Sequence, residues 1–192
     1  MAIHPIHPIH PALRACDLAI VGDSLVEEIR LQSKARTIAL VGVGGSTVRN
    51  WLRLAPDLLS RMHPKAVIIA LGINDVSGWD EDCDVFADRY ERLCALFHDA
   101  GARVFVSTIL PVERGKIWGD AMDTSLISLF NAAIAGIAHD NGYGLIDSHR
   151  ALAGPDGMMQ PGLTTDGVHL SEEGYRRWKP VLIRGAGFAP DE

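Results

Sequence analysis

An acid and an imidazole lie close together near the end of the chain, in the segment DGVHLS at 166–171. Asp166 comes three residues before His169, and Ser171 caps the last predicted helix. A carboxylate beside an imidazole can hold it in one tautomer, and the imidazole can then take a proton from a serine hydroxyl. Taken separately, Asp166 could be a turn former and His169 a partly buried histidine. The pair therefore points to catalysis only if a serine lies nearby.

A candidate serine stands at the opposite end of the chain, in the segment GDSL at 22–25. An apolar run precedes Ser24 and a helical pattern follows it, so the serine lies at a strand-to-helix junction. One interpretation is a helix N-cap, because Glu27 follows three residues later as in a capping box. The other is a nucleophile, whose hydroxyl would lie beside the free N–H groups of a helix start.

Two more polar turns follow apolar runs, GVGGST at 42–47 and GIND at 72–75. Gly45 has no Cβ and could bring its backbone N–H close to a reacting oxygen. Asn74 could be an ordinary turn residue or could donate its side-chain amide to an oxyanion. The glycine turn also partly matches a dinucleotide-binding fingerprint, but Thr47 stands where that fingerprint has its last glycine.

Short apolar runs alternate with amphipathic segments along the chain. The predicted strands are 18–21, 38–43, 66–71, 103–109 and 144–148. The predicted helices are 24–32, 47–61, 84–101, 124–142 and 171–184. This alternation predicts a parallel sheet with helices on both faces. Ligands bind at the carboxyl ends of such strands, so the three polar turns should lie close together.

We expect one domain at 17–192, preceded by an extended arm at 1–16. The arm contains a His-Pro-Ile repeat, and its prolines forbid a helix. A metal site formed by His4, His7 and His10 is disfavoured, because a proline-stiffened segment cannot easily fold three imidazoles around one ion.

Composition narrows the function further. The formal net charge of the 192 residues is −6, which argues against nucleic acid as a partner. No apolar run approaches the roughly 20 residues of a membrane helix, and no signal peptide is visible at the N-terminus, so we expect a cytoplasmic protein. The cysteines at 16, 83 and 94 form no CxxC pair and should be buried and unremarkable. GxSxG, HExxH and P-loop motifs are absent.

The four motifs, in this order, resemble the SGNH (GDSL-type) hydrolases. The resemblance spans residues 18 to about 182 and implies a flavodoxin-like three-layer α/β/α sandwich with a five-stranded parallel sheet. It also implies a serine esterase that acts on a small-molecule ester and needs no metal or organic cofactor.

Carried over residue by residue, the resemblance gives each motif a role. Ser24 would be the nucleophile, His169 the general base and Asp166 its orienting partner. The oxyanion hole would consist of the N–H groups of Ser24 and Gly45 and the side-chain amide of Asn74. The acids of the first and third motifs, Asp23 and Asp75, would hold loops.

The substrate is less constrained than the chemistry. Short connections between strands leave little material for a lid, which favours small acyl groups such as acetate on a sugar or another alcohol. Trp79 and Trp118 lie in loops that could border the cleft, where an indole can stack on a sugar ring or line an acyl pocket. A lysophospholipase or thioesterase acting on longer chains is an alternative. A non-catalytic domain that binds carbohydrate or nucleotide is another.

Overall fold

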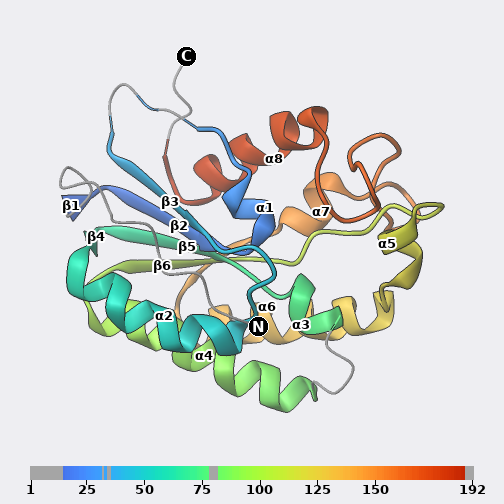
Figure 1. Ribbon diagram of the computed structural model, residues 1–192. Helices are drawn as coiled ribbons and strands as arrows, with labels where there is room; N and C mark the ends of the chain where they lie inside the picture. The colour runs from blue at the N-terminus through green and yellow to red at the C-terminus, as the bar shows by residue number, and fades with distance from the viewer. Residues whose placement is uncertain (1–14, 32, 34–35, 78–81, 189–192) are drawn as a thin grey trace.

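A computed structural model describes residues 15–31, 33, 36–77 and 82–188 of the chain. It has three layers with a five-stranded parallel sheet in the middle (Figure 1). The strands, in the order β3-β2-β5-β6-β7, are β3 (Ile38–Gly42), β2 (Leu18–Gly22), β5 (Ala66–Ala70), β6 (Arg103–Ser107) and β7 (Gly144–Ile146). This order is that of flavodoxin-like folds, so the predicted fold class is confirmed.

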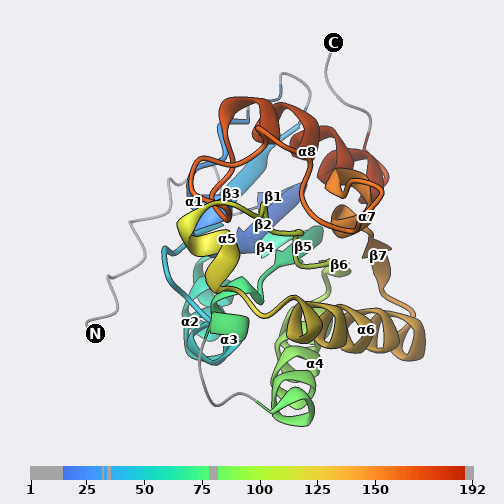
Figure 2. The same cartoon turned by 90° about the vertical axis from the view of Figure 1, so that its right-hand side faces the viewer.

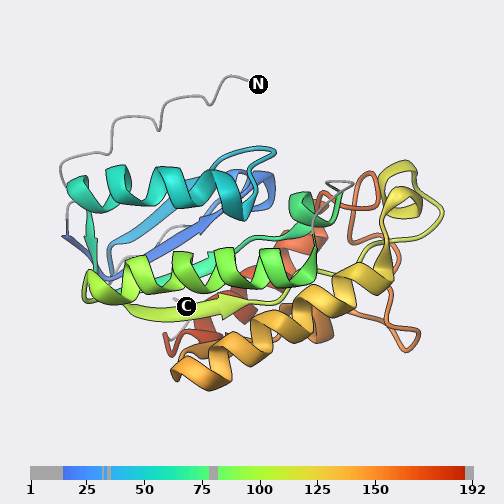
Figure 3. The same ribbon diagram turned by 90° about the horizontal axis from the view of Figure 1, so that it is seen from below.

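Helices cover both faces of the sheet (Figures 1 and 2). One face carries α2 (Val48–Arg61), α4 (Cys83–Asp99) and α6 (Thr124–Asn141), and Figure 3 shows α4 and α6 packed side by side. The other face carries α1 (Ser24–Glu27), α7 (Ser148–Leu152) and α8 (Glu172–Gly185). Two short helices, α3 (Ile73–Ser77) and α5 (Ile117–Ala121), lie beyond the carboxyl ends of the strands.

The core forms where strands are apolar on both sides. Every residue of β2 and of β5 is buried, as expected for the central strands of a covered parallel sheet. Phe86, Tyr90 and Phe97 are buried on one side of α4, as its helical spacing predicts. In the described part of the chain, no helix combines the length and apolar character that a membrane span requires.

The first predicted helix is wrong in length and in its cap. The structure has a single turn at Ser24–Glu27 where the pattern predicted 24–32. The N-cap is Asp23, whose carboxylate accepts the Leu25 N–H, so Ser24 is the first helical residue and forms no capping box with Glu27. The side chain of Arg30 donates to the Glu27 carbonyl, which a helix continuing to residue 32 would have used internally.

Cys16 and Cys94 are buried as expected, Cys83 is only half-buried, and all three cysteines are free. The His-Pro-Ile repeat and Trp79 lie outside the described residues. A small parallel pair, β1 (Ala15–Cys16) with β4 (His63–Pro64), was not predicted.

Candidate active site

The polar turns after β2, β3 and β5 meet at one edge of the sheet because these three strands are neighbours. Ser24 begins α1 directly after β2, Gly45 lies in the turn between β3 and α2, and Asn74 lies on α3 after β5. His169 reaches the same edge from the loop before α8. Positions 145 residues apart in the sequence, Ser24 and His169, are thereby brought into contact.

Ser24, His169 and Asp166 form a continuous hydrogen-bonded series. The Ser24 Oγ lies 3.0 Å from His169 Nε2, and His169 Nδ1 lies 2.7 Å from Asp166 Oδ2. Asp166 Oδ1 accepts the backbone N–H groups of Val168 and His169 at 3.0 and 2.8 Å. Burial opposes ionisation of Asp166, but these hydrogen bonds outweigh it and lower the pKa of the carboxyl below its usual value. A carboxylate is therefore fixed against one imidazole nitrogen while the other faces a serine hydroxyl.

The sequence predicted three N–H groups at this edge of the sheet as oxyanion donors. The Asn74 amide donates one hydrogen to the Ser46 carbonyl at 3.0 Å, which fixes the side chain, and its second hydrogen has no acceptor in the part of the chain that the structure describes. The backbone N–H groups of Ser24 and Gly45 have no acceptor among the described residues. Gly45 has φ +69°, a conformation that favours glycine, although a Cβ there would meet no atom within 4 Å.

Asp23 and Asp75 support chain segments at this edge. Asp23 caps α1 through Leu25, and both carboxylate oxygens of Asp75 accept the Val48 N–H at the start of α2. Both side chains are buried. Burial raises the pKa of each carboxyl to about 7, which fits a structural position rather than an exposed ionised one.

The loop of Asp166 and His169 packs against α5. The Trp118 N–H of this helix donates to the Asp166 carbonyl at 3.1 Å, and the Trp118 side chain is 52% exposed. Sequence reasoning missed Glu113, a buried carboxylate between β6 and α5 that holds the same loop. Its only sequence signal was its place a few residues after a strand, as one acid among several.

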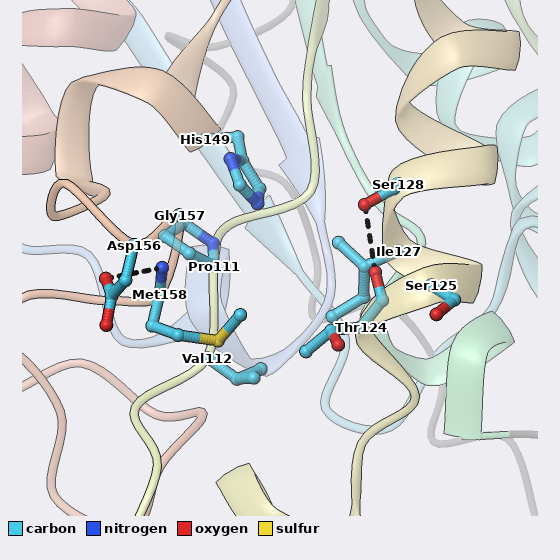
Figure 4. A pocket seen from close by; sticks show the side chains of 10 residues that line it. All are labelled: Pro111, Val112, Thr124, Ser125, Ile127, Ser128, His149, Asp156, Gly157 and Met158. Carbon is cyan, nitrogen blue, oxygen red and sulfur yellow. Dashed lines mark hydrogen bonds between the residues drawn. The ribbon is translucent and has the colours of Figure 1, made fainter.

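A cavity of about 240 Å³ lies between the segment after β6, the start of α6, α7 and the loop that follows α7 (Figure 4). Its lining residues are Pro111, Val112, Thr124, Ser125, Ile127, Ser128, His149, Asp156, Gly157 and Met158. None of the residues predicted from the four motifs is among them, so this cavity is separate from the candidate active site.

Comparison with known proteins gives a family and a fold. The model of the GDSL-like Lipase/Acylhydrolase family matches residues 19–177. No curated protein matches the chain. A GDSL-like lipase from Bacteroides thetaiotaomicron is 20% identical over 93% of this chain and 90% of its own, with a TM-score of 0.78. An acetylxylan esterase from Geobacillus stearothermophilus is 20% identical over 90% of this chain and 94% of its own, with a TM-score of 0.72. At these identities the two structures establish the fold.

Proposed function

The chain belongs to the GDSL-like lipase/acylhydrolase family, an ester-hydrolysing serine hydrolase family, and within it we propose an esterase that removes small acyl groups from a sugar or another alcohol. The observation that carries this proposal is the series Ser24 Oγ–His169 Nε2–Asp166, with contacts of 3.0 and 2.7 Å. A serine hydroxyl becomes a strong nucleophile when an oriented imidazole takes its proton.

The proposed reaction has two halves. In the first, Ser24 Oγ attacks the ester carbonyl, His169 Nε2 takes the hydroxyl proton, and the carbonyl oxygen becomes an oxyanion. The tetrahedral intermediate collapses, the leaving oxygen takes the proton from His169 and departs as the alcohol, and the acyl group stays on Ser24. In the second, water repeats the attack, and the carboxylic acid leaves. The carboxylate of Asp166 stabilises the imidazolium in both halves.

The proposed oxyanion hole consists of the Ser24 and Gly45 N–H groups and the Asn74 amide. One such donor contributes about 3 kcal/mol to transition-state stabilisation in comparable sites. The fixed orientation of the Asn74 amide supports this role, because a donor that is already oriented costs no reorganisation during the reaction.

The small acyl group is inferred from the connections around Ser24. One residue separates β2 from α1, and two separate β5 from α3. An acetylxylan esterase has a similar fold, so this fold can accommodate an acetyl ester of a carbohydrate. On the alcohol side, we propose that the exposed indole of Trp118, next to the loop of Asp166, contacts the substrate. A similar role for Trp79 stays a prediction.

The test is hydrolysis of p-nitrophenyl esters from acetate to palmitate by wild type, Ser24→Ala and Ser60→Ala. Ser60 is the matched control, since its hydroxyl donates to the Asp57 carbonyl on the exposed side of α2. We expect a maximum at acetate, a loss of at least about a thousandfold in Ser24→Ala, and no loss in Ser60→Ala.

Other outcomes would redirect the proposal. A maximum at palmitate would favour the lysophospholipase or thioesterase alternative. Full activity in Ser24→Ala would refute the assignment of Ser24 as the nucleophile. No hydrolysis, together with no labelling of Ser24 by a serine-directed phosphonate, would favour a non-catalytic binding domain.

A further inference from the structure

The loop that carries Asp166 and His169 has no helix or strand of its own to position it. Between α7 and α8 the described structure contains only turns and two isolated bridges, one of which joins Thr164 to Leu170. A hydrolytic site needs its base held to within a fraction of an ångström, and a misplacement of 1 Å can cost about a hundredfold in rate. Contacts from outside the loop must therefore supply the precision.

Glu113 supplies several of these contacts. It lies between β6 and α5 and is 7% exposed. Its Oε1 accepts the Gly162 N–H at 3.0 Å, and its Oε2 accepts both the Thr164 N–H, at 3.0 Å, and the Thr164 hydroxyl. Lys116 Nζ donates to the same Oε2 at 3.0 Å and also to the Thr164 carbonyl. One carboxylate thus holds the chain just before Asp166.

The backbone of Glu113 holds the other side of Asp166. Its N–H donates to the Gly167 carbonyl at 2.9 Å. The Gly167 N–H in turn donates to the Thr164 hydroxyl at 3.1 Å, and that hydroxyl is the one bound to the Glu113 carboxylate. Thr164, two residues before Asp166, and Gly167, directly after it, are therefore both tied to Glu113, a residue from another part of the sequence.

Burial of this carboxylate needs compensation, because an ionised group without partners is costly inside a protein. Burial alone would raise the pKa of Glu113, but hydrogen bonds from Gly162, Thr164 and Lys116 outweigh it and lower the pKa to about 2. Glu113 is thus an ionised acceptor at neutral pH. Its donors come from the loop and from Lys116, whose ammonium also contacts that loop.

We propose that Glu113 is a positioning residue for ester hydrolysis, which holds both flanks of Asp166 and through them keeps His169 in contact with Ser24. It touches neither the substrate nor the reacting atoms in this arrangement. The inference rests on the proposed function, because it assigns Glu113 its role through the series Ser24–His169–Asp166.

The substitution Glu113→Gln is the sharpest probe, because it keeps the size of the side chain. A glutamine has one acceptor oxygen, so its NH₂ group must face either the Gly162 N–H or the Thr164 N–H and Lys116. In each orientation a donor faces a donor, and the loop has to shift. The matched control is Glu91→Gln on α4, which alters an exposed carboxylate that accepts the Asn141 amide and leaves the contacts of the loop in place.

The first measurement is steady-state hydrolysis of p-nitrophenyl acetate, normalised to active sites titrated with a serine-directed phosphonate. We expect kcat per titrated site to fall tenfold or more in Glu113→Gln with KM changed less than threefold, and both constants to be unchanged in Glu91→Gln. We also expect the low-field proton NMR signal of the His169 Nδ1–H···Asp166 hydrogen bond to shift or broaden in Glu113→Gln alone. A purely structural role would lower the number of titrated sites and leave kcat per site unchanged, and that result would overturn the proposal.

The second measurement is a double-mutant cycle with Thr164→Val, which removes the hydroxyl between Glu113 and Gly167 and keeps the shape. If Glu113 acts through Thr164, each single variant lowers kcat about tenfold and the double variant falls well short of a hundredfold loss. Fully additive effects would overturn the proposed route.

Failure of the proposed function can be told apart from failure of the role proposed for Glu113. If wild type hydrolyses no ester and Ser24 is not labelled, the proposed function fails. If wild type is active and labelled while Glu113→Gln keeps its kcat, the proposed function stands and the role of Glu113 is refuted.

Discussion

At the residue scale, the proposed oxyanion hole contains one side-chain donor, and substitution can remove it without touching the backbone. Asn74→Ala should lower kcat about a hundredfold or more, since the lost hydrogen bond forms mainly in the transition state. KM should change only a few-fold. The measurement is hydrolysis of p-nitrophenyl acetate over a range of concentrations.

Asn141→Ala is the control for this prediction. Asn141 is also a side-chain amide at a helix, but it donates to Glu91 and to the Ile137 carbonyl, away from Ser24. The substitution Asn141→Ala should therefore leave kcat unchanged. A loss in Asn74→Ala no larger than that in Asn141→Ala would remove Asn74 from the proposed oxyanion hole.

The residues of the candidate site differ in how well sequence can identify them. Ser24, Asn74, Asp166 and His169 lie in short motifs with glycines and polar neighbours, so local pattern and family resemblance both point to them. Glu113 belongs to no such motif, and its loop partners lie 49 and 51 residues away. Its importance depends on burial and on distant donors, which local sequence does not encode.

At the element scale, the start of α2 depends on a neighbouring helix. Asp75 on α3 accepts the buried Val48 N–H, so Asp75→Ala leaves a helix N-terminal donor without its acceptor. We expect the free energy of unfolding at pH 4, where the raised pKa of this carboxyl carries little linkage cost, to fall by about 1–3 kcal/mol. Urea-induced unfolding, with Asp57→Ala as control, measures the difference. Asp57 forms an exposed pair with Arg61, so its loss should cost under about 1 kcal/mol, and equal losses would contradict the prediction.

The packing of α5 on the loop of Asp166 leaves no room for a side chain at Gly167. This residue has φ +106°, and a Cβ there would lie 2.3 Å from the Gly119 N. Gly167→Ala should therefore displace the loop and lower kcat tenfold or more. Gly157→Ala separates the effect of backbone strain from that of a steric clash. Gly157 has φ +79°, but a Cβ there meets no atom within 4 Å. It should cost about 1–2 kcal/mol of stability with kcat unchanged. Equal kcat losses in the two variants would contradict the packing argument.

Elements long enough to show a period were predictable, and shorter ones were not. The central strands are continuous apolar runs, and α4 and α6 contain several turns of helical spacing. By contrast, α3, α5 and α7 have five residues each, which is too short for a hydrophobic period to be recognised. Apolar spacing predicted a helix over 24–32, but the structure ends it after one turn, at Glu27.

At the scale of the whole molecule, strand order brings the site together. The alternation of strands and helices predicted the sheet, but local pattern does not encode that β2 lies between β3 and β5. Nor does it encode the contact of α8 with α1, where the Tyr175 hydroxyl donates to the Leu25 carbonyl at 2.9 Å. This contact joins the helix after His169 to the helix that begins at Ser24, and so connects the two ends of the chain.

The stability of the whole molecule in acid should depend on Glu113. Its pKa is 4.5 in an unfolded chain and about 2 in the fold, so the folded state binds fewer protons between these values. Its contribution is therefore fully present above pH 4.5 and is lost as the pH falls toward 2. By linkage this contribution is about 3 kcal/mol at pH 6, and about 2 kcal/mol of it is lost by pH 3.

Urea-induced unfolding of wild type and Glu113→Gln at pH 6 and pH 3 tests this linkage. Glutamine does not titrate, so the variant lacks the proton uptake that weakens the wild type in acid. We expect the variant to be less stable at pH 6, with a difference in unfolding free energy that shrinks by about 2 kcal/mol at pH 3. Because titration of the other carboxyls is common to both proteins, it cancels in this difference. A difference that stays the same at both pH values would mean that the Glu113 carboxylate gains no net stabilisation from its donors in the fold.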